Sequence, residues 1–450
     1  MASPPEHAAL TDYERRRQEN IGRNEVILAS LRRKAAELTA IIKLSRPRKQ
    51  PRASRAAPAG PVRRSLRAQG LPPPPHDPSA FAAAPRPRST RLSASLASSI
   101  LTSASPPAPE AKARGGGAGF DPGTELVLTT SHVRRVVPAD RILSVRVLPL
   151  VDRTVVAVGS NLGHVGFWDV DCAVVDDRGD GAHGVFEYMP HLGPVGAIVA
   201  HPATPQKIYS CSYEGEMCLM DLERENFNIT QLSDYPIFSL CQAPNSPSCL
   251  YFGERRDLKL FDERMGKVST ICNAHAGRIN SIDFHPENTY MLATSSRDGT
   301  ACIWDLRTMK KEAESLVVLE HHRGLQSAYF SPSGCMIATT SLDATVRVFS
   351  VDNFENSHTV ERNNSICRCL STFKAIWGWN DTDLFIGNTT RAIDVISVDL
   401  NDTCITATNN ASLVSEHMIS IPYRFSAHPY KVGHIACSSS GGKVFLWTRA

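Results

Sequence analysis

The chain lacks the apolar stretches that mark membrane-spanning and exported proteins. No apolar run in its 450 residues approaches the roughly 18 residues that a membrane span needs. Met1 to Leu10 also lacks a basic stretch followed by an apolar core, the pattern of a secretory signal peptide. We therefore expect no membrane association, and a location in the nucleus or the cytosol.

Close cysteine pairs and catalytic signatures are missing as well. The 12 cysteines lie between Cys172 and Cys437 without a CxxC pair, whereas zinc sites usually need two close pairs of ligands. No G-x-S-x-G elbow, HExxH helix or Walker loop occurs, and Gly441-Gly442-Lys443 lacks the flanking residues of a phosphate-binding loop. The sequence thus predicts reduced core thiols, no metal, no cofactor and no enzymatic activity.

Charge is distributed unevenly along the chain. Residues 1–42 carry 7 basic and 6 acidic side chains, and residues 43–119 carry 14 and 2. Because the total net charge is +4, residues 120–450 have a net charge of 4 − 13 = −9. A basic arm on an acidic body predicts that long-range attraction to polyanions resides in the arm.

Residues 1–42 are predicted to form an N-terminal amphipathic helix. Thr11 and Glu14 fit a capping box, in which each side chain satisfies a backbone N–H at the start of a helix. An apolar stripe follows at three- and four-residue spacing: Ile21, Leu28, Leu31, Ala35, Leu38 and Ile42. A lone helix of this length is marginal in water, so it either docks on a partner surface or stays solvated and frayed.

Residues 43–119 are predicted to be a disordered, basic linker rich in Pro, Ala and Ser. The segment holds 14 prolines and too few apolar residues for a core. Two basic clusters suit nuclear import or contact with a phosphate backbone: Arg46, Arg48, Lys49 and Arg52, then Arg63, Arg64 and Arg67. The alternative is a solvated linker without a specific partner.

Residues 120–450 contain a sevenfold repeat. Each unit ends in an apolar strand with the closing triplets FWD, LMD, LFD, IWD, VFS, VIS and FLW, marked by residues 168, 220, 261, 304, 349, 396 and 447. The intervals of 41 to 52 residues suit propeller blades with some long loops, and Pro, Gly and Asp turns separate the strands. The expected fold is an all-β, seven-bladed propeller. Because the last unit ends near Ala450, we expect a strand around Glu125 to Thr130 to complete the last blade.

The unit AHAGRINSIDFHPENTYMLATSSRDGTACIWDLR, residues 274–307, closely resembles the WD40 family. The resemblance implies a structural hydrogen-bond set made of His275, Ser295, Asp298 and Trp304. In that set the histidine is structural, and we read His191 and His321 in the same way because they occupy the corresponding position of their units.

The segment LATSSRDGTACIWDLR, residues 292–307, is similar to the sixteen-residue box of WD40 proteins that dock on the adaptor of cullin-4 ubiquitin ligases. The resemblance implies adaptor docking by Asp305 and Arg307, and by Asp262 and Arg264 of the preceding unit. Arginine suits this role because its planar fork makes several charge-assisted hydrogen bonds. The alternative is that each Asp–Arg pair is only a local salt bridge.

Two more stretches narrow the resemblance. DYERRRQENIGRNEVILASL, residues 12–31, resembles a motif of the family of WD repeat-containing protein 76 and the yeast changed-mutation-rate protein. FKAIWGWNDTDLFIGNTTRAIDVISVD, residues 373–399, resembles its plant members. The family is related to the small subunit of the ultraviolet-damaged-DNA-binding complex, which implies a nuclear protein of the DNA damage response.

The resemblance suggests four candidate DNA contacts: Arg278, Arg323, Arg368 and Lys374. Arginines in these loops can meet phosphates, and the alternative is that they are solvated. The position that holds a tryptophan in the family is Cys369 here, so base stacking is not expected there. Trp377 and Trp379 are expected to pack in the core or rim rather than stack on bases.

Two functional hypotheses follow. In the first, the chain is a nuclear WD40 scaffold that binds DNA or chromatin in the damage response and serves as a substrate receptor for the cullin-4 ligase. In the second, it is purely a protein-binding hub, such as a histone or chaperone reader, without direct DNA contact. In both, the chain is a monomer that binds other proteins within larger complexes.

Overall fold

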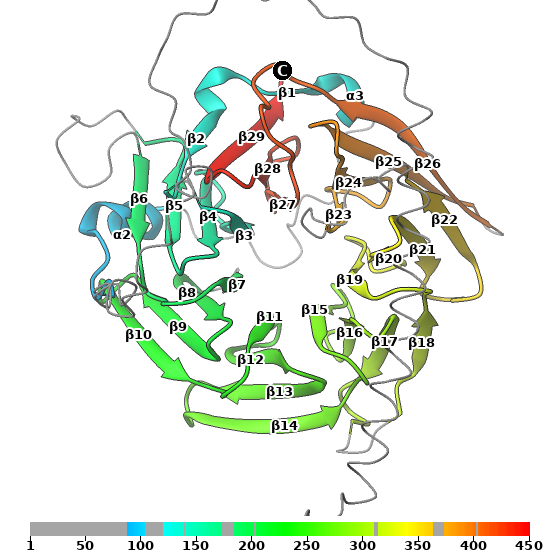
Figure 1. Cartoon of the computed structure of the whole chain (residues 1–450), viewed down its shortest axis with the longest axis horizontal. Helices are drawn as coiled ribbons and strands as arrows, with labels where there is room; N and C mark the ends of the chain where they lie inside the picture. The colour runs from blue at the N-terminus through cyan, green and yellow to red at the C-terminus, as the bar shows by residue number, and fades with distance from the viewer. Residues whose placement is uncertain are drawn as a thin grey trace, which may run out of the picture. The chain divides into compact units, whose positions relative to one another are not determined.

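Seven four- or five-stranded antiparallel sheets stand around a central axis (Figure 1). The computed structural model describes residues 88–103, 120–138, 140–172, 184–201, 204–309, 314–362, 373–401 and 404–450. The predicted N-terminal helix and the basic clusters of the linker lie outside these ranges. The expectation of a seven-bladed propeller is confirmed.

Each of the first six blades consists of four consecutive strands, and the first strand of each is the innermost, nearest the central axis (Figure 1). Blade 1 contains β3 (Ile142–Val147), β4 (Val155–Ser160), β5 (Val165–Asp169) and β6 (Val185–Tyr188). Blade 2 contains β7 (Val195–His201), β8 (Thr204–Ser212), β9 (Glu216–Asp221) and β10 (Asn226–Gln231). Blade 3 contains β11 (Ile237–Ala243), β12 (Ser246–Glu254), β13 (Asp257–Asp262) and β14 (Lys267–Asn273).

The next three blades repeat this order. Blade 4 contains β15 (Ile279–Phe284), β16 (Met291–Ser296), β17 (Thr300–Asp305) and β18 (Val317–Glu320). Blade 5 contains β19 (Leu325–Phe330), β20 (Met336–Ser341), β21 (Thr345–Ser350) and β22 (Ser357–Glu361). Blade 6 contains β23 (Ile376–Trp377), β24 (Asp383–Gly387), β25 (Ile393–Asn401) and β26 (Cys404–Leu413).

Blade 7 joins the two ends of the propeller sequence. It contains β27 (Arg424–Ala427), β28 (Ile435–Ser438) and β29 (Lys443–Arg449), and β29 pairs with β1 (Leu126–Val127) and β2 (Val133–Arg135). The short helix α3 (Pro122–Glu125) precedes β1, and the short helix η4 (Thr130–His132) lies between β1 and β2. Leu126 pairs with Arg449, so the predicted closure by an N-terminal strand is confirmed. This pairing removes a free sheet edge and closes the ring.

The residue types explain why the inner parts of the blades are strands. β4 has the sequence VVAVGS, and all six residues are buried. A strand that is covered on both faces by neighbouring blades reads as a continuous apolar run with β-branched residues. Gly299 has a φ of 98° in the turn between β16 and β17, a conformation that glycine adopts without the strain other residues incur.

Residues 88–103 form an ordered segment, called here the strap, on the outside of blades 1 and 2. Its helix α2 (Ala94–Leu101) buries Leu96, Ala97 and Ile100 against the cores of these blades. A bridge from Arg91 to Asn226 places the strap beside β10. The prediction of disorder over 43–119 is therefore wrong for 88–103. The physical reason is that a few apolar residues are enough to order a short segment when they pack against the core of a folded domain.

None of the helices in the described ranges is both long and apolar enough to traverse a bilayer. Within the same residues, no group of three or more His, Cys, Asp or Glu side chains is arranged to hold a metal ion.

Candidate nucleic-acid and partner interfaces

Strand register defines two faces of the propeller, as blade 4 illustrates. Ile279 pairs with Ser296 and Ser295 pairs with Ala301, so the start of β15 and the β16–β17 turn share one end of the blade, the upper face. Met291 pairs with Asp305 at the opposite end, the lower face. Six residues at about 3.3 Å each separate the two faces by roughly 20 Å.

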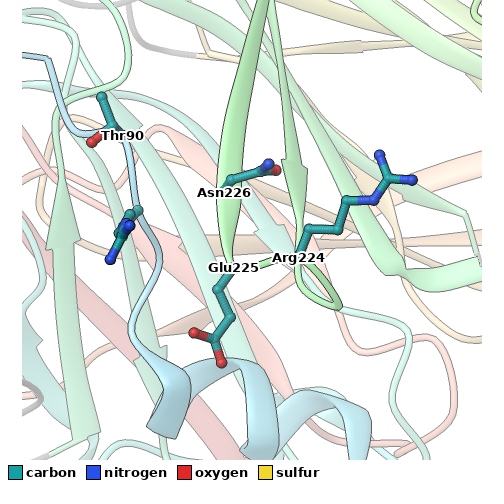
Figure 2. Close-up of a pocket in the computed structure, with 5 residues that line it drawn as sticks. Thr90, Arg224, Glu225 and Asn226 are labelled. Atoms are coloured by element: carbon teal, nitrogen blue, oxygen red, sulfur yellow. The ribbon is translucent and has the colours of Figure 1, made fainter.

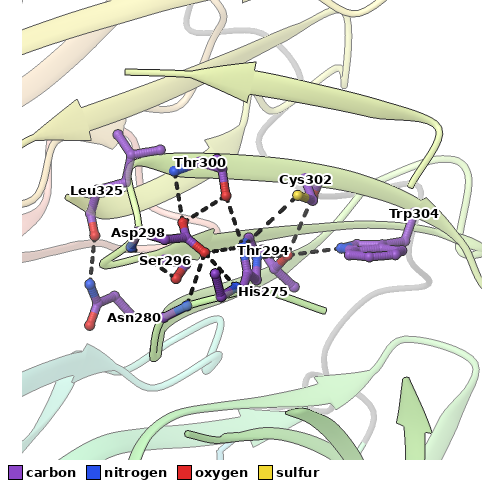
Figure 3. A network of polar contacts seen from close by, with 11 residues as sticks. His275, Asn280, Thr294, Ser296, Asp298, Thr300, Cys302, Trp304 and Leu325 are labelled. Carbon is purple, nitrogen blue, oxygen red and sulfur yellow. Dashed lines mark hydrogen bonds and ion pairs between the residues drawn. The ribbon is translucent and has the colours of Figure 1, made fainter. Parts of the chain in front are cut away.

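Blade 4 contains a hydrogen-bond network around His275 (Figure 3). Its Nε2 lies 2.7 Å from Thr294 Oγ1, and Trp304 Nε1 donates to the same hydroxyl at 2.8 Å. Its Nδ1 lies 3.3 Å from Asp298 Oδ2 and 3.0 Å from Thr300 Oγ1. His275, Thr294 and Trp304 are buried, so the network satisfies polar atoms that water does not reach. This is the geometry that a structural histidine requires.

The hydroxyl of this network belongs to Thr294, and the prediction of Ser295 is wrong. Successive side chains of β16 point to opposite faces of the sheet, so a shift of one residue changes the partner. Thr294 faces Trp304, whereas Ser295 lies 2.7 Å from Ser281 Oγ on the other face. The matching hydroxyls are Ser210 beside His191 at 2.8 Å and Thr339 beside His321 at 3.1 Å.

His275 and Asp298 form a strongly coupled pair. Burial alone would lower the pKa of His275, but the hydrogen bond to Asp298 outweighs it and raises the pKa to about 9. Burial would likewise raise the pKa of Asp298, but hydrogen bonds from His275 and Thr300 hold it far below its usual range. The pair is therefore an ion pair at neutral pH.

Five arginines form a continuous row on the upper face of blades 3 to 5, called here the basic arc: Arg255, Arg256, Arg278, Arg297 and Arg323. Their backbones adjoin one another. Ile279 N donates to Arg255 O at 2.8 Å, and Arg297 N donates to Arg278 O at 2.9 Å. A methyl group at Gly324 would lie 2.8 Å from the Arg297 carbonyl oxygen, which places Arg323 next in the row. All except the half-buried Arg278 are exposed.

Arg255 occupies a strained position at the tip of the β12–β13 turn. Its φ is 52°, in the left-handed region, where the corresponding upper-face turns of blades 1, 2, 4 and 7 place a glycine. The guanidinium lies over the ring of Tyr235, 4.7 Å from its centre. An arginine held at a backbone angle that disfavours it is typical of a functional position.

A second set of cations lies where the inner strands begin, at the channel mouth, which consists of Lys374, Arg278, Arg424 and Asn280. Lys374 Nζ donates to Asn280 O at 3.1 Å, and Arg278 Nε donates to Asn280 Oδ1 at 3.0 Å. Arg424 Nε donates to Leu143 O at 2.8 Å. Burial and the charges of Arg424 and Arg278 lower the pKa of Lys374 to about 7.

The structure thus brings three of the four predicted DNA contacts to the upper face. Arg278 and Arg323 belong to the basic arc, and Lys374 belongs to the channel mouth; Arg368 lies outside the described residues. Trp377 and Trp379 are buried, with their indoles bonded to Tyr329 O and His428 O at 2.9 Å each. The expectation that these tryptophans pack in the core or rim is confirmed.

The predicted docking residues lie on the lower face, in two places called here the docking corners: Asp305 with Arg307, and Asp262 with Arg264. Arg307 Nε lies 3.0 Å from Asp305 Oδ1, and Nη2 lies 2.7 Å from Oδ2. The hydrogen bonds from Arg307 lower the pKa of Asp305. Arg264 is more loosely held, 3.7 Å from Asp262, and the two arginine side chains are 62% and 74% exposed.

Blade 1 differs from blades 3 and 4 at the corresponding position, whereas blade 2 carries an exposed Asp–Arg pair similar to that of blade 3. The carboxylate of Asp169 in blade 1 is bound by Arg153 at 2.8 Å and by Ser99 of the strap. In blade 2, Asp221 faces Arg224 at 3.8 Å. A cleft of about 330 Å³ lies between the strap and blade 2 (Figure 2), and it is lined by Thr90, Arg91, Arg224, Glu225 and Asn226. This lining contains no histidine or cysteine.

Sequence reasoning missed Arg255, Arg256, Arg297 and Arg424. The signal for the first two was the pair Arg-Arg between two apolar strands, at a position that other units fill with glycine. The signal for Arg297 was its place in the turn SSRDG, beside the predicted Asp298. These arginines are neighbours because adjacent blades pack side by side, and the spacing of residues along the chain does not reveal that packing.

Comparison with known proteins agrees with the propeller fold. The family model described as WD domain, G-beta repeat matches residues 266–305 and 313–350. WD repeat-containing protein 76 of Xenopus laevis is 28% identical over 273 residues, covering 58% of this chain and 45% of the relative. The Mus musculus protein of the same name is 26% identical over 336 residues, covering 72% and 51%. The chain thus spans about half the length of these relatives.

A fungal relative carries a more descriptive name. DNA damage-binding protein cmr1 of Neurospora crassa is 27% identical over 349 residues, covering 70% of this chain and 65% of the relative. The chain is a WD40 propeller protein. Within that class it is distantly similar to WD repeat-containing protein 76 and to the fungal CMR1 proteins, at 26% to 28% identity.

Proposed function

We propose that this chain is a nuclear WD40 scaffold of the DNA damage response that contacts duplex DNA directly through the basic arc. The observation that carries the proposal is the contiguity of five arginines on one face of a body whose net charge is negative. Guanidinium groups pair with phosphate oxygens, and phosphate contacts supply most of the affinity of a sequence-independent binder. The fungal relatives are named DNA damage-binding proteins, which supports the same partner.

Local charge matters more than net charge for this interface. Two acidic residues of the same turns are already engaged, Glu254 with Lys259 and Asp298 with His275. The arc therefore presents its guanidinium groups to a ligand that approaches the upper face.

The test is the salt dependence of binding to a naked duplex, measured with the purified full-length chain. If the arc neutralises about five phosphates, it contributes about −4.5 to the slope of log K against log salt. The double variant Arg255→Ala/Arg256→Ala should lose about two units of that slope. The matched control is Arg224→Ala, an equally exposed arginine that lies away from the upper face, and it should bind as the parent does.

The basic linker is expected to add phosphate contacts, so a chain without residues 43–87 should bind DNA more weakly. This deletion stops before Arg88 because the strap packs on blades 1 and 2. Unchanged binding would contradict the role of the linker. Absence of any duplex binding at physiological salt would overturn the main proposal in favour of a purely protein-binding hub, such as a histone or chaperone reader.

We further propose that the docking corners engage the adaptor of the cullin-4 ubiquitin ligase, so that the chain serves as a substrate receptor. The observation that favours this second role is the exposed, bidentate ion pair of Arg307 with Asp305. Because the carboxylate holds the guanidinium in one orientation, less conformational entropy is lost when a partner binds it. The exposed Tyr290 and Met265 flank the two corners and offer apolar contact area.

A further inference from the structure

The channel mouth differs from the basic arc in how its cations are held. The four outer arginines of the arc are exposed, whereas Lys374, Arg278 and Arg424 are only partly accessible. Lys374 precedes the inner strand of blade 6, yet it bonds to Asn280 at the start of the inner strand of blade 4. A contact that passes over blade 5 requires the side chain to lie near the axis, where the inner strands converge.

Asn280 fixes the two cations in place. Its backbone carbonyl accepts from Lys374, its Oδ1 accepts from Arg278, and its Nδ2 donates to Leu325 O at 2.6 Å. Arg278 is also stacked on Phe238, with its guanidinium carbon 4.1 Å from the ring centre. The positions of both charges are thus determined before any ligand arrives.

The donors of this pair are only partly used. Among the described residues, Lys374 has one hydrogen bond and Arg278 uses only Nε, so two ammonium hydrogens and both Nη groups remain for a ligand. Neither side chain forms an ion pair with a carboxylate there. The ten residues that precede Phe373, NNSICRCLST, contain no Asp or Glu. Asp283 lies five residues after Arg278, further along β15, and its Oδ2 accepts from Phe330 N at 2.8 Å.

Like charges held together without a counter-charge are costly unless an anion completes the site. The low pKa of Lys374 is one expression of that cost. A phosphate group would offset this cost, since its negative charge neutralises the cations and its three terminal oxygens can accept from donors that converge from different blades. A planar carboxylate offers only two oxygens and one negative charge, so some of these hydrogen-bond donors would be left without an acceptor.

We propose that the channel mouth binds one terminal phosphate group, carried either by the end of a nucleic-acid strand or by a small polyphosphate. A continuous duplex backbone remains on the exposed arc, whereas a terminal phosphate can enter the recessed mouth. The two sites are adjacent because Arg278 belongs to both. The mouth does not require that the arc binds DNA, so each can be tested separately.

The experiment is isothermal titration of the full-length protein at constant ionic strength with three probes. These are pyrophosphate, a single-stranded oligonucleotide with a 5′-phosphate, and the same oligonucleotide with a 5′-hydroxyl. Saturable binding of pyrophosphate is expected, and Lys374→Met should weaken it about tenfold or more, the usual cost of losing one charge-assisted hydrogen bond. A preference for the 5′-phosphate oligonucleotide identifies a strand end as the source, and no preference identifies a small polyphosphate.

Two further variants keep the test decisive. Arg278→Met should weaken pyrophosphate binding as Lys374→Met does, and thermal unfolding shows whether each variant is folded. Arg255→Ala/Arg256→Ala should retain pyrophosphate binding while it loses duplex affinity. Absence of pyrophosphate binding, or equal affinity in the parent and both methionine variants, overturns the phosphate site. Loss of duplex binding alone overturns only the proposed DNA function.

Discussion

Trp304 donates its indole N–H to the hydroxyl of Thr294 at 2.8 Å, across two neighbouring strands of blade 4. The same hydroxyl contacts His275 at 2.7 Å, so one oxygen connects the histidine to the tryptophan. We predict that Thr294→Val destabilises the propeller by about 1–3 kcal/mol, because it leaves buried polar groups without a partner. Chemical denaturation measures the change in the free energy of unfolding.

The matched control for this prediction is Ser295→Ala on the other face of the same strand. Its partner Ser281 keeps a second contact, since it accepts from Ala328 N at 3.0 Å. The loss should therefore be smaller than for Thr294→Val. An equal or larger loss in Ser295→Ala would contradict the assignment of the network to Thr294.

The ion pair of His275 and Asp298 predicts a pH dependence of stability. The folded pKa of His275, about 9, exceeds the ordinary value of 6.5, so the contribution is full below pH 6.5 and is lost as the pH rises through about 9. The low pKa of Asp298 adds stability that is present above its ordinary value of 3.8 and is lost as the pH falls further. The pair is thus most stabilising between about pH 4 and 6.5.

This pH dependence is measured as a difference between the parent and Asp298→Asn, because other groups such as Lys374 titrate in the same range. Urea denaturation at several pH values should show that the gap in the free energy of unfolding narrows from pH 6.5 to 9. A gap that stays constant over this range would show that His275 does not carry the charge.

The strap lies outside the repeat sequence, yet we predict that its buried residues contribute to the stability of the propeller. Leu96 and Ile100 are 0% and 1% exposed against the cores of blades 1 and 2. Leu96→Ala should therefore cost about 2–5 kcal/mol, as for other buried leucines. Ser98→Ala on the exposed side of α2 is the control and should change the melting temperature little. If both variants melt alike, the helix does not pack as described.

The docking corners predict a loss of partner binding without a loss of stability. Arg307 is exposed, and exposed ion pairs contribute about 0–1 kcal/mol, so Arg307→Ala should melt nearly as the parent does. Affinity capture with the cullin-4 adaptor should fail for this variant and weaken for Arg264→Ala. Arg224→Ala serves as the control on blade 2. Retained capture by Arg307→Ala would refute the docking proposal.

The fold was largely predictable from the closing triplets, because each triplet ends a strand that must be buried between two blades. Trp304 identified its blade, and the shortage of strands near Ala450 pointed to the pairing that Leu126 makes with Arg449. The strap was missed because its surroundings are rich in Ser and Ala. Leu92, Leu96 and Ile100 recur every four residues, and that spacing was the signal of a helix with one apolar side.

The candidate sites were less predictable. Ser295 and Thr294 are adjacent hydroxyl residues, and only the register of β16 decides which one faces Trp304. The row from Arg255 to Arg323 depends on contacts between blades, so an arginine in one turn gives no sign of its neighbour in the next. Lys374 was predicted from the resemblance, but its position over the channel follows from a bond to Asn280 in another blade.

Blades 3 and 4 carry the basic arc at one end of their strands and the docking corners at the other. These strands are continuous ladders without a hinge, so occupation of one end has no discrete movement through which to alter the other. The two binding free energies should therefore be additive. A ligand on the upper face would neither recruit nor repel a partner below, and co-localisation on one rigid body would be the whole contribution of the propeller.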